Sequence, residues 1–428
     1  MKILFVADNF PPEKNAQASR VYERACYWAR WGHQVTVITC APNFPEGSVY
    51  QGYKNSWYYV EEMSGIRVVR TKSLIASNSG TVIRTLDFIS FMLTSFAVGL
   101  IQRKPDVVAA TSPQFFAAIS GCVLSIFKRV PFVMEVSDLW PDSIVAVGAM
   151  KQSPIIRVLE RIELALYARA KRVVLLTHAF RENLSRRNVP DEKLDVVRNG
   201  ADLQRYTPCA RDAELARKWD LEGCFVIGYI GTLGMAHALD NVLKAAAKVT
   251  DPTVRFLFVG PGADRDCLVA RAAEMELRNV IFIPPQPKSE MPRYWSLCDV
   301  SLVHLKNTPL FETVIPSKIF EAMAMGLPIL LAAPEGEASE IVQNDKAGIC
   351  VPAEDPQALA DAVSLLAQNP RLRNSFATAS RLAAASHSRE TQAKEMLRSL
   401  TAAITKPERQ PAVQSPIYEL SHSDQSKA

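Results

Sequence analysis

The sequence lacks the closely spaced cysteines and histidines that hold a structural metal ion. Its eight cysteines are scattered without a CxxC pair, and its six histidines form neither an HxH nor an HExxH pattern. Because zinc ligands must converge on one ion, such spacings are the usual sign of a zinc site. We therefore expect no bound metal, and the scattered cysteines indicate a reducing compartment.

Signals for export and for nucleic-acid binding are also missing or weak. No basic segment, apolar core and cleavage site precede the apolar run at residues 3–7, so we expect a cytoplasmic protein. The net charge of +5 is too small to indicate nucleic acid, although it suits anionic substrates or an anionic membrane surface.

One apolar run, at residues 88–101, is too short to span a bilayer. Arg84 precedes it, and Arg103 and Lys104 follow it. Two interpretations stay open: a buried crossover helix, or a helix that lies on a membrane surface. The second would make the protein a peripheral one on the cytoplasmic face of the inner membrane.

Short runs rich in Val and Ile recur along the chain, separated by segments of helix length. Such a pattern is typical of buried parallel strands joined by crossover helices. The runs fall into two series, at 3–7, 35–39, 66–71, 107–111, 132–136, 172–177 and 195–198, and at 226–230, 254–259, 280–283, 300–305, 329–332 and 348–351.

Two series predict an α/β protein with two doubly wound, Rossmann-like domains that face each other across a cleft. The pattern breaks at 205–223, so we place the first domain at 1–205 and the second at 206–385. We expect a C-terminal helix at 386–404 that packs back on the first domain. The Ser- and Gln-rich residues 405–428 are expected to be a disordered tail.

The segment 316–328 is the most informative stretch of the chain. It is predicted to open from a loop at Pro316 and Ser317 into a short helix that Gly326 ends. The start of a helix offers unpaired N–H groups and the positive end of the peptide dipole, and both suit a phosphate group.

Two charged side chains make that helix start a candidate nucleotide site. Lys318 adds a positive charge, and Glu321 lies about one turn further along the same face. A carboxylate there can accept two hydrogen bonds from the diol of a ribose. The alternative is an ordinary capped helix with a surface ion pair.

Two glycine-rich turns follow strands of the second domain. In 228–234, Gly231 and Gly234 would let the backbone approach a ligand and Thr232 would supply a hydroxyl, unless this is only a flexible loop. In 259–262, Arg265 stands where a dinucleotide fingerprint needs its third glycine. We therefore expect a tight turn near the base of a nucleotide.

The first domain offers candidates for an acceptor side. Asp138 and Asp142 follow a strand and flank Trp140, which could stack on a sugar, although Asp142 could simply cap a helix. The polar first loop, 9–16, leads into a helix that carries Arg20. That arginine could reach an acceptor phosphate or could lie on the surface.

In these features the chain resembles the family 4 retaining glycosyltransferases of the GT-B fold. It is most similar to the bacterial surface-polysaccharide branch that includes the L-fucosamine transferases. The resemblance covers residues 1 to about 400 and is carried by 10–13, 32–39, 105–108, 138–142, 199–202, 231–233 and 316–328.

The resemblance implies transfer of a sugar, an N-acetylated amino sugar or a deoxy sugar, with retained configuration. The donor would be a UDP-sugar and the acceptor a lipid-diphosphate-linked saccharide of O-antigen, capsule or exopolysaccharide synthesis. Neither metal nor cofactor is implied, because the nucleotide-sugar is a substrate.

The resemblance also implies roles for single residues. Glu321 would bind the ribose, and Ser317 and Lys318 the diphosphate. The rest of the implied donor site is Gly231, Thr232, Leu233, Gly262 and Pro316. The implied acceptor side is Phe10, Pro11, Asn15, Arg20 and Trp140. Lys318, Glu312 and Asp138 are the catalytic candidates.

Three departures from the family pattern affect these roles. The family's second glutamate falls at Thr313, and Glu312 is one residue away. The usual Arg and Lys after Gly231 are replaced by 235–238, so diphosphate neutralisation would depend more on Lys318. The usual glycine pair of the first loop is replaced by 15–17.

Three rivals stay open. A GT-B-fold sugar-nucleotide epimerase would share the donor site but need no acceptor. A non-catalytic, two-lobed sugar-binding protein would have no reason to place Lys318 and Glu321 at one helix start. A nicotinamide oxidoreductase is disfavoured by Arg265.

Overall fold

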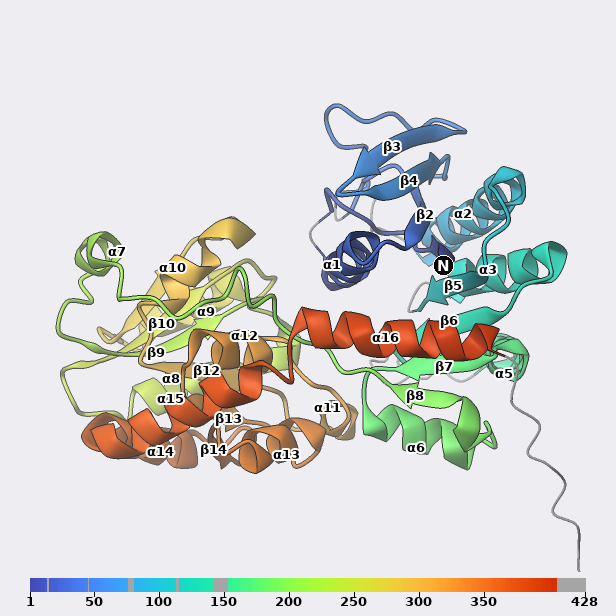
Figure 1. Ribbon diagram of the computed structural model, residues 1–428. Helices are drawn as coiled ribbons and strands as arrows, with labels where there is room; N and C mark the ends of the chain where they lie inside the picture. The colour runs from blue at the N-terminus through green and yellow to red at the C-terminus, as the bar shows by residue number, and fades with distance from the viewer. Residues whose placement is uncertain (14, 45, 76–80, 113–114, 142–152, 406–428) are drawn as a thin grey trace, which may run out of the picture.

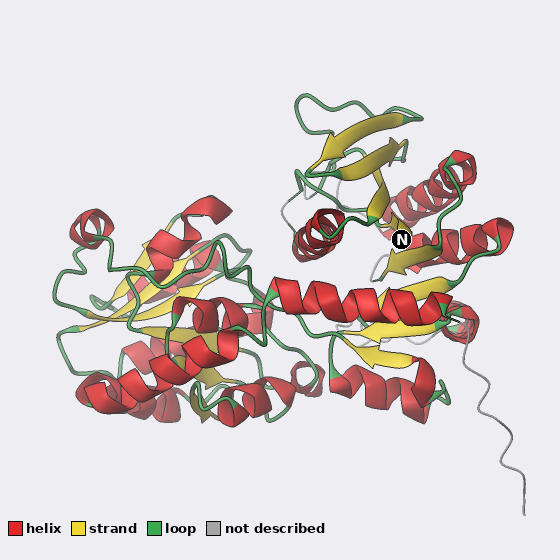
Figure 2. Ribbon diagram, in the orientation of Figure 1, coloured by secondary structure: helices red, strands yellow, loops and turns green. Residues whose placement is uncertain are grey.

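The computed structural model describes residues 1–13, 15–44, 46–75, 81–112, 115–141 and 153–405, and shows two α/β domains joined near residue 200 (Figure 1). In each domain a layer of strands lies between helices (Figure 2). The expectations for Asp142 and for the tail after Thr405 fall outside the described residues.

The first domain contains an eight-stranded sheet in the order β3-β4-β2-β1-β5-β6-β7-β8. Every neighbouring pair is parallel except β3 and β4, which are antiparallel. Its strands are β1 (Lys2–Val6), β2 (Gln34–Cys40), β3 (Tyr59–Met63), β4 (Ile66–Thr71), β5 (Val107–Thr111), β6 (Phe132–Val136), β7 (Arg172–Leu175) and β8 (Leu194–Val196).

The sequence prediction missed β3 and overextended two other strands. β3 lies at the edge of the sheet and carries Glu61 and Glu62, so its sequence contains no apolar run. An edge strand buries little surface and can be polar. The runs predicted at 172–177 and 195–198 end earlier, at Leu175 and Val196.

Two helix layers cover the first sheet. On one face lie α2 (Thr81–Ile101), α3 (Phe115–Lys128), α5 (Pro154–Arg169) and α6 (His178–Arg186), whose apolar residues share one core with the sheet. On the other face lie α1 (Ala16–Arg30) and α16 (Arg389–Ile404), which share a second core with it. A short 3₁₀ turn, η1 (Asp191–Lys193), precedes β8.

The second domain has a six-stranded parallel sheet in the order β11-β10-β9-β12-β13-β14. Its strands are β9 (Phe225–Ile230), β10 (Val254–Val259), β11 (Val280–Ile283), β12 (Val300–His304), β13 (Ile329–Ala332) and β14 (Gly348–Val351). Its helical segments are α7 (Ala213–Lys218), η2 (Met235–His237), α8 (Asp240–Ala246), α9 (Arg265–Glu274), η3 (Lys288–Glu290), α10 (Met291–Trp295), α11 (Pro309–Glu312), α12 (Lys318–Met325), α13 (Glu337–Asn344), α14 (Pro356–Gln368) and α15 (Pro370–Ala384).

The last helix belongs structurally to the first domain. After α15 the chain returns, and α16 packs along α1 and over β5, β6 and β7 (Figure 1). Its residues Ala393, Met396 and Leu400 are fully buried. The indole N–H of Trp28 donates a hydrogen bond to the carbonyl of Ala393 at 2.9 Å. Residues near the start of the chain and residues of α16 therefore share one core.

Candidate functional site

The site centres on the first turn of α12. Pro316 is buried and Ser317 is exposed where the chain enters the helix, and the Ser317 side chain makes no capping hydrogen bond. At the other end, Gly326 adopts a left-handed conformation with φ of 70°, and its N–H bonds back to the helix. The helix start therefore presents an exposed hydroxyl beside the positive end of the dipole.

Lys318, the first residue of α12, is the most unusual side chain of this region. It is 9% exposed, and its Nζ has no hydrogen-bond partner among the residues that the structure describes. The Nζ lies 3.7 Å from the centre of the Tyr229 ring, within cation–π range. Burial lowers the pKa of Lys318 to about 7, against a smaller opposing effect of the Glu321 charge.

Gly231 lies directly against this lysine. Its φ is +146°, and a Cβ added there would come within 3.2 Å of Lys318 Nζ. The next residue, Thr232, is exposed, and its carbonyl accepts a hydrogen bond from the Tyr229 hydroxyl at 2.8 Å. The loop after β9 and the start of α12 thus meet at Lys318.

The turn after β10 packs against the loop that follows β9. Leu233 N–H donates to the Pro261 carbonyl at 2.7 Å, and Leu233 itself is fully buried. A Cβ on Gly262 would lie only 1.9 Å from the Leu233 carbonyl oxygen. Packing alone therefore requires a glycine at position 262, because any side chain there would prevent the two loops from approaching this closely.

Glu321 lies one turn after Lys318 and is partly buried. Burial raises the pKa of its carboxyl group, and the charges of Lys288 and Arg389 and a hydrogen bond with Tyr206 partly offset this effect. Tyr206, Lys288 and Arg389 come from the segment after β8, from η3 and from α16. Sequence reasoning missed all three, because no local motif marks them.

His237 lies in the segment where the family pattern has cations, beside His304 at the end of β12. The Nδ1 of His237 lies 3.2 Å from the His304 carbonyl, and the Nδ1 of His304 lies 2.7 Å from the His237 carbonyl. Burial lowers the pKa of each to about 4, and the nearby Lys318 charge acts in the same direction. Both rings are therefore neutral at pH 7, so neither histidine supplies the positive charge that the family pattern has here.

The structure gives several acceptor-side candidates structural partners. Phe10 is fully buried and packs edge-on against Tyr22, so it faces the core and not the surface. Asn15 caps α1, because its side chain accepts a hydrogen bond from Ala18 N–H at 2.8 Å. The carbonyl of Pro11 accepts a hydrogen bond from the Arg70 guanidinium.

Arg20 is buried, and its guanidinium group is paired with Glu135. It is 4% exposed, and its Nε lies 3.1 Å from a Glu135 oxygen, while Arg24 holds the other oxygen at 2.7 Å. Although burial opposes it, the two arginines lower the pKa of Glu135 to about 2. The expected surface position of Arg20 is therefore wrong, because the side chain belongs to a buried ion-pair network, and its reach to an acceptor phosphate stays a prediction.

Two further candidates occupy the loop after β6. Trp140 is partly buried and packs against Phe115, with ring centres 4.7 Å apart. The carbonyl of Asp138 accepts hydrogen bonds from the Ser112 hydroxyl and from Trp140 N–H. In the second domain, Glu312 ends α11 and is exposed.

Polar residues that sequence reasoning passed over gather at the carboxyl end of β1. The carboxylate of Asp8 accepts hydrogen bonds from Asn9 at 2.6 Å and from Gln17 at 2.9 Å. Burial raises the pKa of Asp8. Burial, together with the Asp8 charge, raises the pKa of Asp87 on α2 to about 6. This edge of the first domain is a polar surface suited to hydroxyl groups.

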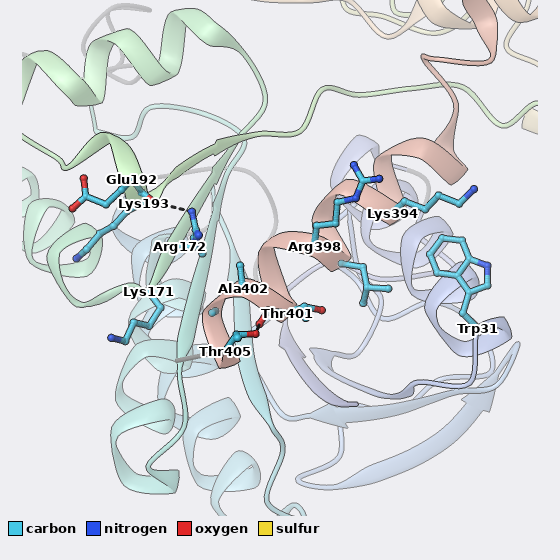
Figure 3. A pocket seen from close by; sticks show the side chains of 12 residues that line it. Trp31, Lys171, Arg172, Glu192, Lys193, Lys394, Arg398, Thr401, Ala402 and Thr405 are labelled. Atoms are coloured by element: carbon cyan, nitrogen blue, oxygen red, sulfur yellow. Dashed lines mark hydrogen bonds between the residues drawn. The ribbon is translucent and has the colours of Figure 1, made fainter. Parts of the chain in front are cut away.

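A large hollow lies away from these residues. Its volume is about 1130 Å³, and it runs between α16 and the start of β7, with Lys171, Arg172 and Arg398 on its walls (Figure 3). Among the described residues, no three His, Cys, Asp or Glu side chains group so that they could hold a metal ion.

Glu23 on α1 connects the two domains close to the Glu321 region. Its carboxylate lies 3.2 Å from Lys288 Nζ, 2.8 Å from Arg389 Nε and 3.4 Å from an Arg205 nitrogen. A second link involves Glu337 on α13, which accepts hydrogen bonds from His178 N–H and from Arg198. The residues around Glu321 are therefore positioned by both domains.

Comparison with known proteins agrees with this arrangement. Residues 15–200 match the model of the glycosyl transferase 4-like domain, and residues 211–383 match that of the glycosyl transferases group 1. The chain is 26% identical to the putative colanic acid biosynthesis glycosyl transferase WcaI of Escherichia coli K12, over 84% of this chain and 90% of that protein.

More distant likenesses point the same way. A GDP-mannose-dependent alpha-mannosyltransferase of Mycobacterium tuberculosis is 25% identical, over 89% of this chain and 91% of that one. The crystal structure of Anabaena Alr3699/HepE in complex with UDP-glucose superimposes with a TM-score of 0.70 at 17% identity, and covers 94% of this chain and all of that one. The chain therefore belongs to the family 4 glycosyltransferases, with a group 1 second domain and the GT-B fold.

Proposed function

We propose that this protein transfers a sugar, an N-acetylated amino sugar or a deoxy sugar, from a UDP-sugar to a lipid-linked saccharide. The product would belong to bacterial O-antigen, capsule or exopolysaccharide synthesis. One observation carries the donor part: the buried amino group of Lys318 has no hydrogen-bond partner among the residues that the structure describes, and it lies at the start of α12 against Gly231. The polysaccharide part is supported by the similarity to WcaI.

The chemistry of the α12 site suits a nucleoside diphosphate. Burying a cation without an anionic partner is costly, and a diphosphate supplies the missing acceptors. The Ser317 hydroxyl and the helix dipole add further attraction for anionic oxygens. Glu321, which shares a hydrogen bond with Tyr206, would accept hydrogen bonds from a ribose diol.

In the proposed reaction, the bond between the sugar C1 and the β-phosphate oxygen breaks, and its electron pair stays on the diphosphate. The acceptor hydroxyl oxygen bonds to C1 on the same face, and its proton passes to the departing phosphate. Lys318 would stabilise the charge that grows on the leaving group. A preorganised charge of this kind contributes most when water is excluded.

Replacement of the lysine tests this role. We expect Lys318→Ala to lower turnover about a hundredfold or more while the protein stays folded, because a preorganised donor to the leaving group is lost. The matched control is Lys306→Ala, an exposed lysine on the loop after β12. Wild-type turnover by a folded Lys318→Ala protein would remove Lys318 from the mechanism.

A nucleotide screen tests the donor class. Ligand-induced thermal shifts should be largest for UDP-sugars, smaller for GDP- and dTDP-sugars, and strongly reduced in Lys318→Ala. If GDP-mannose gave the larger shift, the donor of this protein would instead be GDP-mannose, the donor in the name of the mycobacterial relative. Incubation with the donor alone separates transfer from epimerisation, because an epimerised nucleotide-sugar without acceptor would support an epimerase.

A further inference from the structure

The helix α2 is unusually apolar for a helix on the outside of a domain. By length and composition, one helix among the described residues, Ile83–Ile101 within α2, could cross a membrane, yet only 22% of its apolar window is buried inside the protein. A core helix would be mostly buried. Most of α2 is therefore not fully covered by the domain that it belongs to.

The contacts of α2 show that it is part of the folded domain. Phe91 is 1% exposed and lies in the core that α2 shares with the sheet. Ser95 and Ser120 hydroxyls are hydrogen-bonded at 2.7 Å, which ties α2 to α3. A Cβ on Gly99 would lie 2.5 Å from a Leu124 methyl, so the two helices pack closely. Inserting α2 across a bilayer would open this core, so the helix can lie on a membrane but cannot span it.

Exposed apolar side chains concentrate on this helix layer. The described chain has twenty-one large, exposed hydrophobic residues, and eleven of them lie on α2, α3 and α5. The most exposed are Leu93 at 59%, Ile101 at 70%, Phe127 at 64% and Ile155 at 63%. α2 packs along α3, and α3 contacts α5 (Figure 1). Patches of this kind mark interaction sites.

Positive charges predominate around these residues. In 83–106, 126–130 and 154–169, the exposed charged residues are one acid, Asp106, and seven bases: Arg84, Arg103, Lys104, Arg129, Arg157, Arg161 and Arg169. Among the partly buried charged residues of the same ranges, Lys128 adds a positive charge, and Asp87 and Glu160 add two negative ones. Apolar side chains flanked by arginines and lysines are complementary to an anionic lipid surface, because the apolar groups enter the boundary layer and the cations meet the phosphates.

We infer that the outer side of α2, α3 and α5, the docking face, lies on the surface of a bilayer that contains anionic phospholipids. It is defined by Leu93, Ile101, Ile126, Phe127, Ile155 and Val158, together with the flanking cations Arg103, Lys104 and Arg129. The inference goes beyond the proposed transfer reaction and does not depend on it. The α1 and α16 layer on the other face of the sheet carries one of the twenty-one exposed residues, Ile404.

Vesicle flotation tests the docking face. The full chain is mixed with vesicles of phosphatidylglycerol and phosphatidylcholine, or of phosphatidylcholine alone, and centrifuged through a density gradient. We expect binding to the anionic vesicles, loss of binding at high salt, and little binding to phosphatidylcholine alone.

The apolar part is tested with a triple variant, Leu93→Gln, Phe127→Gln and Ile155→Gln. Vesicle binding should fall about tenfold or more, because three exposed apolar side chains no longer enter the lipid. The matched control changes three exposed apolar residues of the second domain, Val269→Gln, Leu365→Gln and Leu382→Gln, and should bind as the wild type does. Substitution of Phe91 is unsuitable, because that side chain belongs to the core.

If the triple variant has a lowered melting temperature, a charge variant still tests whether the docking face binds anionic vesicles. Arg103→Glu with Lys104→Glu should weaken binding to anionic vesicles about thirtyfold or more, since each lost surface cation contributes about 1 kcal/mol there. Lys248→Glu with Arg278→Glu, which are exposed in the second domain, is the control.

Three results would overturn the inference. Unchanged flotation of the folded triple variant or of the charge variant would remove these residues from the contact. Equal binding to neutral and anionic vesicles would contradict the role of the cations. Failure to float, combined with a dimer that the triple variant converts to a monomer by light scattering, would assign the docking face to a second copy of the chain.

Discussion

At the scale of single residues, Lys318 carries the clearest functional signal in the molecule. A buried ammonium group that lies over an aromatic ring and has no hydrogen-bond partner among the described residues is destabilising in the folded protein, as its lowered pKa shows. Such an environment is typical of a group kept ready for a charged ligand. The neutral histidines His237 and His304 leave this role to Lys318.

The lowered pKa predicts a proton linkage that calorimetry can measure. At pH 8 most Lys318 side chains are neutral, since the pKa is about 7, and a bound diphosphate should raise the pKa again. UDP binding should therefore take up as much as about one proton at pH 8, and its affinity should fall as the pH rises from 7 to 9. Titrations in two buffers of different ionisation enthalpy measure the uptake.

Lys318→Ala is the control for that measurement. The variant keeps the protonation equilibria of UDP itself but lacks the lysine, so the uptake should disappear. Binding without proton exchange in the wild type at pH 8 would show that the diphosphate does not contact Lys318.

At the scale of elements, the β9 and β10 loops form one unit that positions the backbone beside Lys318. The close approach of Gly262 to the Leu233 carbonyl leaves no room for a Cβ. Gly234, in the same loop, has space, because the nearest atom to an added Cβ would be a Thr232 methyl at 3.6 Å. A side chain at position 234 can therefore be accommodated, whereas one at position 262 cannot.

Alanine substitutions should separate the two positions. We expect Gly262→Ala to lower the free energy of unfolding by about 1–3 kcal/mol and to weaken UDP binding, since the loops must move apart. Gly234→Ala should change stability by no more than about 0.5 kcal/mol. Urea denaturation and UDP titration give both quantities, and equal effects of the two variants would contradict the loop-packing account.

The sequence predicts most strands and the start of α12, and the reasons lie in local patterns. Parallel strands such as β10 and β13 are buried on both faces and read as apolar runs. The edge strand β3 is not visible in this way. Tyr206, Lys288 and Glu23 cannot be found from local patterns either, because their importance arises from contacts between segments far apart in the chain. The burial of Arg20 likewise depends on Glu135, which lies on another element.

At the scale of the whole molecule, Glu23 is a shared anion for three segments. Although burial opposes it, the charges of Arg389, Lys288 and Arg205 hold the pKa of Glu23 below its usual value. Lys288 and Arg389 also act on Glu321. The relative position of the domains and the carboxylate that faces a ribose in our proposal are therefore electrostatically connected.

Removal of this shared anion should be costly. We expect Glu23→Gln to lower the free energy of unfolding by about 2–3 kcal/mol, because the Arg389 and Lys288 charges lose their partner at a largely buried position. The matched control is Glu390→Gln, which breaks an exposed pair with Lys394 on the same helix α16 and should cost no more than about 0.5 kcal/mol. Equal melting of the two variants would show that Glu23 contributes no more than a surface ion pair.

The position of α16 has a consequence for how the protein is made. During translation the first sheet leaves the ribosome long before residues 389–404 exist, and until then the side of Trp28 that Ala393, Met396 and Leu400 will cover stays in contact with water. Domains that emerge early usually fold early. Here the earliest part of the nascent polypeptide acquires its final core only after residues 389–404 have been made, so a ribosome that stalls after the second sheet would release a chain with an exposed apolar face.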